Sequence, residues 1–180
     1  INIQNALAAI VVADYLGVEL EKIQKGIASF RGVKRRFEIV GRVKGITVID
    51  DYAHHPTKIR KTLEAARTRY RKNKIYVVFE PHTYTRTKTL LSDYAKAFNQ
   101  ADEVIIAELM PAREKGQKPI ITSKEVVKAI REYNKNVRFI SCPSKILKYL
   151  SSRLEKGDVV IVMSVGGLEN LAIKLKQALV

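Results

Sequence analysis

Short apolar segments alternate with amphipathic helical segments along most of this sequence, and this alternation restricts the fold more than any other feature. The apolar segments at 75–79, 104–107, 137–140 and 159–163 have the length and the β-branched content of strands. Between and around them, apolar residues recur at helical spacing in the stripes Ile59, Leu63, Ala66 and Tyr70; Leu90, Tyr94, Ala97 and Ala101; Val126, Val127 and Ile130; Ile146, Leu147 and Leu150; and Leu168, Leu171, Leu175 and Leu179. This pattern predicts an α/β, Rossmann-like fold, with a mainly parallel sheet, helices on both faces and right-handed crossovers.

The first part of the chain has a different pattern, which predicts a helical hairpin. Apolar residues recur at helical spacing on both sides of Gly17, a residue type that commonly ends a helix. The two stripes are Ala6, Ala9, Ile10 and Ala13, followed by Leu20, Ile23, Ile27 and Phe30. The chain begins at Ile1 with the first stripe already running and without an initial methionine. We therefore expect a piece of a longer polypeptide.

The apolar period changes from helical to strand-like after this hairpin. The segments 37–43 and 46–49 are typical of two strands joined by a turn at Gly45. The pair is a candidate antiparallel edge for the parallel sheet that follows. We expect one domain at 1–33 and a second at 34–180.

The composition is that of an ordinary globular protein, with 46% hydrophobic and 28% charged residues. No segment approaches the ~18 consecutive apolar residues of a membrane span, and the first residues lack the order of a secretory signal. The single cysteine, Cys142, excludes an intramolecular disulfide and suits a reducing compartment. We expect a cytoplasmic protein with no membrane partner, and we assign Cys142 no role.

A net charge of +15, from 33 basic and 18 acidic residues, favours anionic partners. The basic residues gather at 34–36 and 67–74, without an aromatic-studded motif or a zinc-finger spacing. Most of them are expected to lie on a solvated surface. The charge nevertheless leaves open a non-catalytic module that binds an anion or a nucleic acid.

Unusual polar residues follow several of the expected strands. Loops and helix N-termini converge outside the carboxyl ends of parallel strands, and ligands bind there. Asp50 and Asp51 close one strand, 81–86 follows another, and 111–114 and 164–167 follow two more. We expect these segments to lie on one rim of the sheet.

The first of these segments reads Asp50-Asp51-Tyr52-Ala53-His54-His55-Pro56. Pro56 suits the first position of a helix. The residue types are typical of an exposed acidic loop with solvent-facing histidines, one of which can cap that helix. A metal site is less favoured, because adjacent histidines diverge and no Glu or Cys recurs nearby at ligand spacing.

His82 and Arg86 stand four residues apart at the start of another expected helix. This spacing places an imidazole and a guanidinium on one side of the helix N-terminus, where they suit a carboxylate or a phosphate. Alternatively, Arg86 pairs with Glu80 or Asp93 and His82 only fills the turn. Both interpretations stay open on spacing alone.

Gly166 and Gly167 follow the last strand. They would let a backbone approach a phosphate, but a tight strand-to-helix turn explains them equally well. No G-x-x-x-x-G-K-[ST] loop occurs in this sequence. The phosphate cradle of any nucleotide site must therefore lie elsewhere.

Several segments, taken together and in order, resemble the Mur ligase family. The segment 2–9 is similar to the end of that family's central domain, and 30–37 is similar to its exit into the C-terminal domain. The segments 50–56, 81–86 (Pro-His-Thr-Tyr-Thr-Arg) and 111–114 resemble motifs of the C-terminal domain. The last two are most particular to the branch of the family that joins L-alanine to UDP-N-acetylmuramate.

The resemblance implies a three-domain, ATP-dependent enzyme of peptidoglycan biosynthesis. The carboxylate of UDP-N-acetylmuramate would be phosphorylated, and the amine of L-alanine would attack the acyl phosphate. Mg²⁺ would neutralise the phosphates and be bound mainly by the central domain. Most of that domain would lie before Ile1, so this chain alone is expected to be inactive.

On the nucleotide side, the resemblance implies roles for four residues. Asn2 and Asn5 would face the nucleotide from the central domain. Arg36 would organise its phosphates, and Asp51 would contact it when the domains close.

On the substrate side, the resemblance implies that His82 and Arg86 hold the alanine end of the substrate, with His54 and His55 lining the same cleft. No catalytic residue and no metal ligand is assigned within this chain. The nearest alternative is another Mur-type ligase, such as one that attaches a preformed tripeptide. A nucleic-acid partner is less favoured, because the special residues stand at strand ends rather than along a basic stripe.

Overall fold

The computed structural model of the protein describes residues 2–168 and 170–180, with the side chain of Asn2 outside the described part. The chain divides into two compact units, Ile1–Val33 and Lys34–Val180. The described residues of the first unit form helices, and those of the second form a sheet with helices.

The first unit is a helical hairpin, as the sequence pattern predicts. Helix α1 (Asn2–Tyr15) is followed by Gly17, which has a φ of 76°. The N–H of Val18 donates to the carbonyl oxygen of Ala13 at 3.0 Å, as in a Schellman motif. Helix α2 (Leu20–Ser29) then packs back against α1.

Helix α1 carries apolar side chains that stay exposed. Val11 is 66% exposed and Val12 is 58% exposed, whereas Ile23 of α2 is buried. A two-helix hairpin is too small to cover apolar residues on all sides of a helix. None of the described helices combines the length and the hydropathy that crossing a membrane requires.

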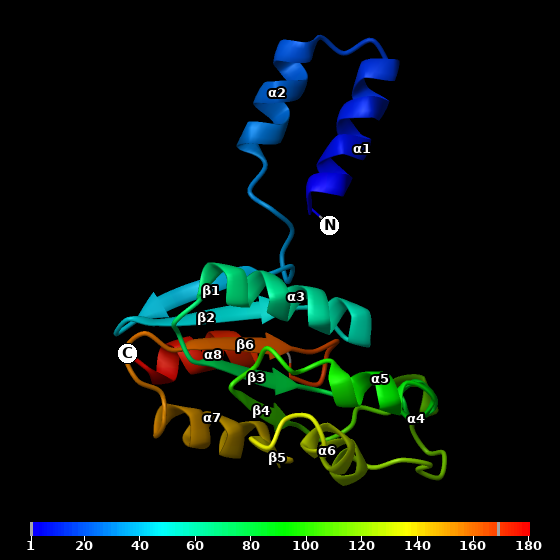
Figure 1. Ribbon diagram of the computed structural model, residues 1–180, viewed down its shortest axis with the longest axis vertical. Coiled ribbons are helices and arrows are strands. Elements are labelled where there is room, and N and C mark those ends of the chain that lie inside the picture. Colours follow the sequence, from blue (N-terminus) through cyan, green and yellow to red (C-terminus); the bar gives the residue numbers. More distant parts are fainter. Residues whose placement is uncertain (1, 169) are drawn as a thin grey trace. The chain divides into compact units, whose positions relative to one another are not determined.

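The described part of the second unit forms a six-stranded sheet in the order β1-β2-β6-β3-β4-β5 (Figure 1). The strands are β1 (Glu38–Val43), β2 (Ile46–Asp51), β3 (Ile75–Phe79), β4 (Glu103–Ile106), β5 (Val137–Phe139) and β6 (Val159–Met163). β1 runs antiparallel to β2, and the other neighbouring pairs are parallel. The predicted α/β fold, with its parallel sheet and antiparallel edge, is confirmed.

Helices cover both faces of this sheet (Figure 1). They are α3 (Pro56–Arg69), α4 (Tyr84–Thr89), α5 (Leu91–Lys96), α6 (Ser123–Arg131), α7 (Pro143–Ser151) and α8 (Leu171–Ala178), with a 3-10 turn, η1, at Ala112–Glu114. Helices α3, α5 and α6 share a core with Val77 and Phe79 of β3, whereas α7 and α8 share a core with Tyr76 and Val78. Successive side chains of a strand point to opposite faces, so a strand covered on both sides is apolar throughout.

The helical stripe from Leu90 to Ala101 is the main departure from the predicted elements. A helix over the whole stripe is wrong at its end, because α5 begins after Leu90 but ends at Lys96, and residues 97–100 form turns. The rings of Tyr94 and Phe98 then pack against Phe79, with centroids 5.5 and 5.4 Å from it. Packing of large aromatic rings outweighs the local helical period here.

Candidate functional site

The carboxyl ends of β2, β6 and β3 lie side by side, and the segments that follow them form one rim of the sheet. These segments are 52–56 after β2, 80–86 after β3 and 164–167 after β6. A fourth segment, 108–114, follows β4 and joins 80–86 through an isolated parallel bridge. The rim expected from the strand ends is therefore present.

His54, His82 and Arg86 lie together on this rim. The ring centroids of His54 and His82 are 6.2 Å apart. Nη1 of Arg86 lies 3.4 Å from Nδ1 of His82 and donates a hydrogen bond to it. In the part of the chain that the structure describes, Arg86 forms no ion pair, so pairing with Glu80 or Asp93 is not observed. We call these three side chains the clamp.

Both imidazoles of the clamp favour the neutral form. Burial lowers the pKa of His54, with Arg86 lowering it further against a hydrogen bond to Tyr52 that raises it. The pKa of His82 is lowered by burial first and by Arg86 second. Near neutral pH, the positive charge of the clamp therefore resides on Arg86.

The hydrogen bonds of the two imidazoles assign their tautomers. Nδ1 of His54 lies 2.9 Å from the carbonyl oxygen of Tyr52, so it carries the proton and leaves Nε2 as an acceptor. His82 accepts from Arg86 at Nδ1, so its proton is on Nε2. The clamp thus offers a charged fork, one neutral acceptor and one neutral donor, which suits an anion that also bears a polar group.

His55 is placed differently from His54. Its Nδ1 accepts a hydrogen bond from the N–H of Thr57 at 3.3 Å, and Pro56 occupies the first turn of α3. The side chain of His55 is exposed. The structure gives His55 the capping position that the sequence left open, and it brings only His54 to the clamp.

Asp51 is 4% exposed, and its carboxylate binds backbone N–H groups of two segments. Its Oδ2 accepts from the N–H of Phe37 at 2.7 Å, and its Oδ1 accepts from the N–H of Ala53 at 2.6 Å. Burial raises the pKa of Asp51, and these two hydrogen bonds oppose that rise. The carboxylate fixes a turn in which Phe37 has a φ of 52°.

Arg35 joins three parts of the rim, although the sequence did not single it out. Its Nε lies 3.3 Å from Oδ2 of Asp50, and its Nη2 donates to the carbonyl oxygen of Ser164 at 2.7 Å. The guanidinium groups of Arg35 and of the exposed Arg36 each lie 5.3 Å from the ring centroid of Tyr52. Arg35 is therefore occupied within the chain, and Arg36 is the arginine of this pair that faces solvent.

The glycine pair after β6 surrounds a carboxylate of the same chain. Oε2 of Glu80 accepts from the N–H of Gly167 at 3.0 Å and lies 3.5 Å from the nitrogen of Gly166. A Cβ atom on Gly167 would overlap Oε1 of Glu80. Burial raises the pKa of Glu80, while the backbone N–H donors of the loop oppose the rise. Close approach of Glu80 explains Gly167, which favours the tight-turn interpretation over a phosphate cradle.

Glu114 contacts the first turn of α4, the helix that carries Arg86, and the sequence analysis assigned it no role. It is 6% exposed, and its Oε2 accepts from the N–H groups of Tyr84 and Thr85 at 2.5 and 3.1 Å. Its only sequence signal is its place in the segment 111–114. The partner that it caps is 30 residues away, and no local period reveals that distance.

The two asparagines expected on the nucleotide side belong to the first unit. Asn5 is exposed on α1. Asn2 begins α1, and its side chain lies outside the described residues. Their nucleotide contacts stay predictions.

The described ranges 2–168 and 170–180 contain no group of three or more His, Cys, Asp or Glu side chains placed to hold a metal ion. In the clamp, the guanidinium of Arg86 would repel a cation beside the two imidazoles. The described residues therefore do not fit a Mg²⁺ site.

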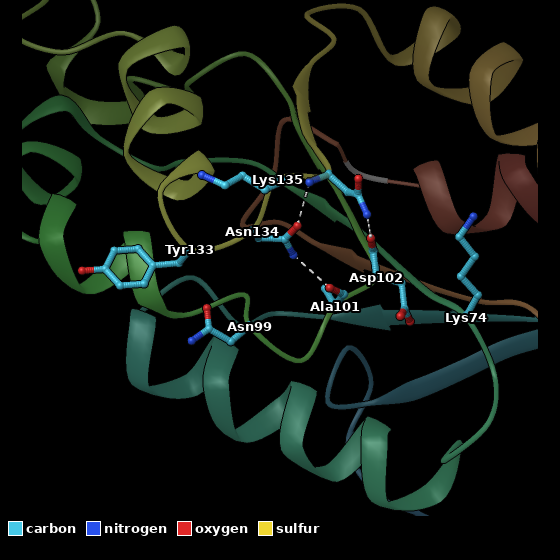
Figure 2. A pocket seen from close by; sticks show the side chains of 8 residues that line it. Lys74, Asn99, Ala101, Asp102, Tyr133, Asn134 and Lys135 are labelled. Carbon is cyan, nitrogen blue, oxygen red and sulfur yellow. Dashed lines mark hydrogen bonds between the residues drawn. The ribbon is translucent and has the colours of Figure 1, made fainter.

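A depression of about 440 Å³ lies at the opposite rim, where the strands begin (Figure 2). Lys74, Asp102 and Asn136 line it and directly precede β3, β4 and β5. Nδ2 of Asn134 donates to the carbonyl oxygen of Ala101 at 2.9 Å, and its Oδ1 accepts from the N–H of Asn136 at 3.0 Å. These polar groups tie loops together, and we assign this depression a structural role.

Comparison with known proteins finds one matching family model and similar ligases. The family model described as "Mur ligase, glutamate ligase domain" matches residues 35–166. A UDP-N-acetylmuramate–L-alanine ligase from Caldanaerobacter subterraneus subsp. tengcongensis is 46% identical over 167 residues, which cover 93% of this chain and 36% of that protein.

The solved structures that match nearly the whole chain include two of similar sequence identity. UDP-N-acetylmuramate-alanine ligase MurC from Thermotoga maritima has a TM-score of 0.82 and 29% identity, over 98% of this chain and 37% of that one. A murein peptide ligase from Psychrobacter arcticus 273-4 has a TM-score of 0.75 and 30% identity, over 99% of this chain and 36% of that one. The chain thus spans little more than a third of the length of the relatives that it matches.

Proposed function

This chain belongs to the Mur ligase family, and from that premise we propose that it is the C-terminal part of an ATP-dependent ligase that joins L-alanine to UDP-N-acetylmuramate. The observation that carries the proposal is the clamp, in which Arg86 lies against His82 and His82 lies beside His54. The names of the relative at 46% identity and of the Thermotoga maritima structure support this branch of the family.

The chain covers 36% of its relative, so the remaining parts of the enzyme are proposed to lie outside it. We assign 1–33 to the end of the central, nucleotide-binding domain and 34–180 to the C-terminal domain. The exposed Val11 and Val12 support the first assignment, because a complete domain normally covers such residues. This chain alone is therefore proposed to be inactive. The single cysteine and a nucleotide substrate suit the cytoplasm.

Amide formation in water requires an activated carboxylate. In the proposed reaction, ATP phosphorylates the carboxylate of UDP-N-acetylmuramate, and the neutral amine of L-alanine attacks the carbonyl carbon of the acyl phosphate. The C–N bond forms as the C–O bond to phosphorus breaks, phosphate leaves, and the nitrogen loses a proton. Holding the amine beside the carbonyl is the contribution that we assign to this chain.

Each member of the clamp has a proposed task in that step. Arg86 binds the carboxylate of L-alanine with two parallel hydrogen bonds. His54, with Nε2 unprotonated, accepts a hydrogen bond from the amine. His82 orients Arg86 through Nδ1. His55 supports this loop by capping α3.

In the second unit, the proposed nucleotide contacts are Arg36 and the turn next to it. Arg36 is exposed and suits a phosphate group. We propose that Asp51 acts there by fixing the turn at Phe37, beside Arg36, because its two carboxylate oxygens already accept backbone N–H groups. Asn2 and Asn5 are proposed to face the nucleotide from the first unit. Mg²⁺ is proposed to be bound mainly by the central domain, and no step is assigned to it here.

A ligase that attaches a preformed peptide is the second candidate. The murein peptide ligase structure supports it, because it matches this chain at 30% identity, close to the 29% of the alanine ligase. Both enzymes would need a carboxylate clamp. The two candidates differ in whether free L-alanine or a peptide is held.

Ligand-observed NMR on this chain tests the proposal. L-Alanine, UDP-N-acetylmuramoyl-L-alanine and the tripeptide L-alanyl-γ-D-glutamyl-diaminopimelate are titrated separately, with sheared DNA as the control for non-specific anion binding. Arg86→Ala is compared with Lys88→Ala, a matched control that removes an exposed positive charge from the same helix.

We expect the alanine-bearing compounds to bind, and Arg86→Ala to weaken that binding about tenfold or more, the usual effect of losing one partner of a charged pair. Lys88→Ala should change it little. Preferential binding of the tripeptide would favour the second candidate. Salt-sensitive binding of DNA alone would replace both by a nucleic-acid module. If nothing binds, the same pair of variants is assayed for turnover in the full-length enzyme, where equal activity of Arg86→Ala and Lys88→Ala contradicts the clamp.

A further inference from the structure

We propose that Glu114 is a positioning residue for the clamp: its carboxylate fixes the first turn of α4 and so sets the direction in which Arg86 meets its ligand. The inference rests on the proposed function for its effect on substrate. The positioning itself is a property of the chain that can be measured without any substrate.

Helix α4 begins without a cap of its own. Its N-cap residue, Thr83, has a φ of 60° and makes no side-chain capping bond within the described residues. The first N–H groups of a helix need an acceptor. Glu114 supplies it from η1, because one of its oxygens accepts from both Tyr84 and Thr85. A negative charge at this end also interacts favourably with the helix dipole.

The capped turn carries the clamp. Arg86 is the third residue of α4, directly after the two residues that Glu114 binds, and α4 has only six residues. A helix this short has little intrinsic stability, so its direction depends on outside contacts. Loss of the Glu114 bonds would therefore release Arg86 as well as the turn.

A second connection holds the other end of the same segment. The N–H of Met110 donates to the carbonyl oxygen of Pro81 at 2.9 Å, and the carbonyl oxygen of Met110 accepts from the N–H of Thr83 at 2.8 Å. His82 lies between these two bonds, in a parallel bridge with Met110. The segment 108–114 thus fixes His82 through its backbone and Arg86 through Glu114.

Each of the two connected segments contains a residue with an unfavourable backbone conformation. Thr83 and Ala112 both have positive φ, 60° and 51°, although neither is glycine. Such backbone conformations are unfavourable for residues other than glycine and persist only where neighbouring contacts hold them. Thr83 directly precedes the residues that Glu114 binds, and Ala112 lies in the same 3-10 turn as Glu114, so the Glu114 bonds connect the two unfavourable sites.

In the described part of the chain, the Glu114 carboxylate bonds to backbone N–H groups and forms no ion pair with Arg86. Burial alone would raise the pKa of Glu114, but hydrogen bonds from Thr85 and Tyr84 outweigh it, and the pKa is lowered. Glu114 therefore stays ionised. Because no ion pair between Glu114 and Arg86 is found in the described part of the chain, the guanidinium keeps its charge for a ligand.

The first test is spectroscopic and needs no ligand. In Glu114→Gln and Glu114→Ala, the amide proton signals of Tyr84 and Thr85 should move upfield, more in Ala than in Gln, because a charged acceptor binds more strongly than a neutral one. The heteronuclear NOE of Arg86 should fall in the same order. Glu132→Gln removes an exposed carboxylate and serves as the control. Unchanged amide signals and an unchanged NOE in Glu114→Ala would overturn the inference, whatever the chain's function.

The second test uses the full-length ligase. Glu114→Ala should raise the KM for L-alanine about tenfold, and Glu114→Gln about twofold to threefold, with little change in the KM for UDP-N-acetylmuramate. A role limited to folding would instead lower active enzyme and leave both KM values alone. If Arg86→Ala raises the KM for L-alanine but Glu114→Ala does not, the positioning role fails and the proposed function stands. If neither variant changes it, the proposed function fails, and the NOE of Arg86 decides the positioning role.

Discussion

The phenolic hydroxyl of Tyr94 donates a hydrogen bond of 2.6 Å to the backbone carbonyl oxygen of His54, which ties α5 to the loop after β2. Tyr94 is fully buried, and burial raises its pKa to about 12, so it remains a donor over the whole neutral range. The imidazole of His54 is anchored separately, through Tyr52. The backbone of His54 is therefore held by Tyr94 and its side chain by the carbonyl oxygen of Tyr52.

Tyr94→Phe tests this support. The change leaves the carbonyl oxygen of His54 without its donor, and we expect the free energy of unfolding to fall by about 1–2 kcal/mol. Urea unfolding followed by circular dichroism measures the change. Tyr133→Phe is the matched control, because Tyr133 is 49% exposed. Equal effects of the two variants would mean that the Tyr94 bond contributes nothing specific.

The lowered pKa values of His54 and His82 predict a pH dependence of stability. Below the ordinary histidine pKa of 6.5, the unfolded chain takes up protons that the folded imidazoles resist. The free energy of unfolding should therefore fall as the pH drops below 6.5, until the folded imidazoles also protonate. Urea unfolding of the His54→Gln, His82→Gln double variant, which cannot take up these protons, should show a weaker fall; an unchanged slope contradicts the prediction.

Arg86→Ala should raise the pKa of His82. Arg86 is the second cause of the lowered value after burial, so removing its charge moves the pKa back towards the ordinary one. NMR titration of the imidazole Cε1 proton measures the shift. Lys88→Ala, on the same helix, should leave the titration in place. A His82 pKa that responds equally to both variants would indicate a general charge effect and not a contact with Arg86.

Gly167→Ala and Gly166→Ala should differ sharply although the positions are adjacent. The added methyl group overlaps Glu80 at Gly167, whereas at Gly166 its nearest neighbour is Met110 at an ordinary contact distance of 3.6 Å. We expect a loss of about 1–3 kcal/mol at Gly167 and less than about 0.5 kcal/mol at Gly166. Thermal unfolding of the two variants measures both values. Similar losses would show that the Glu80 contact does not determine this turn.

Asp51→Asn should destabilise the rim. Asparagine has one acceptor oxygen where aspartate has two, so the N–H of either Phe37 or Ala53 loses its partner, at a cost of about 1–3 kcal/mol. Asp93→Asn, at an exposed position, should cost less than about 0.5 kcal/mol. Urea unfolding compares them. Equal stability of the two variants would mean that the hydrogen bonds of Asp51 to Phe37 and Ala53 do not stabilise the rim.

The sequence predicts the sheet well where apolar runs are continuous and bounded. The expected strands at 75–79 and 159–163 coincide with β3 and β6, because every residue of these strands is buried on one face or the other. The spacing of His82 and Arg86 indicated that both lie on one side of a helix N-terminus, which their contact confirms, but it left their role open. Strand order was not, because the pairing of β6 with both β2 and β3 depends on contacts across the whole chain.

The residues that support the rim could not be predicted from the sequence, because their partners are also distant along the chain. Glu114 reaches Tyr84 over 30 residues, Tyr94 reaches His54 over 40, and Glu80 reaches Gly167 over 87. Local periodicity carries no information about partners at such distances. Arg35 was missed for a different reason. It stands in the run Lys34-Arg35-Arg36, which is typical of a solvated surface, and nothing in such a run indicates that one of its arginines bonds to Asp50 and Ser164.

The position of β6 has a consequence for the order in which a ribosome makes this chain. β2 and β3 both pair with β6 and not with each other. The strands that precede the loops of His54 and His82 can therefore be joined in the sheet only after residues 159–163 have been made. Both histidines are synthesised long before that point. A nascent chain that has already emerged through α7 thus contains His54, His82 and Arg86 but lacks the strand that pairs with both β2 and β3.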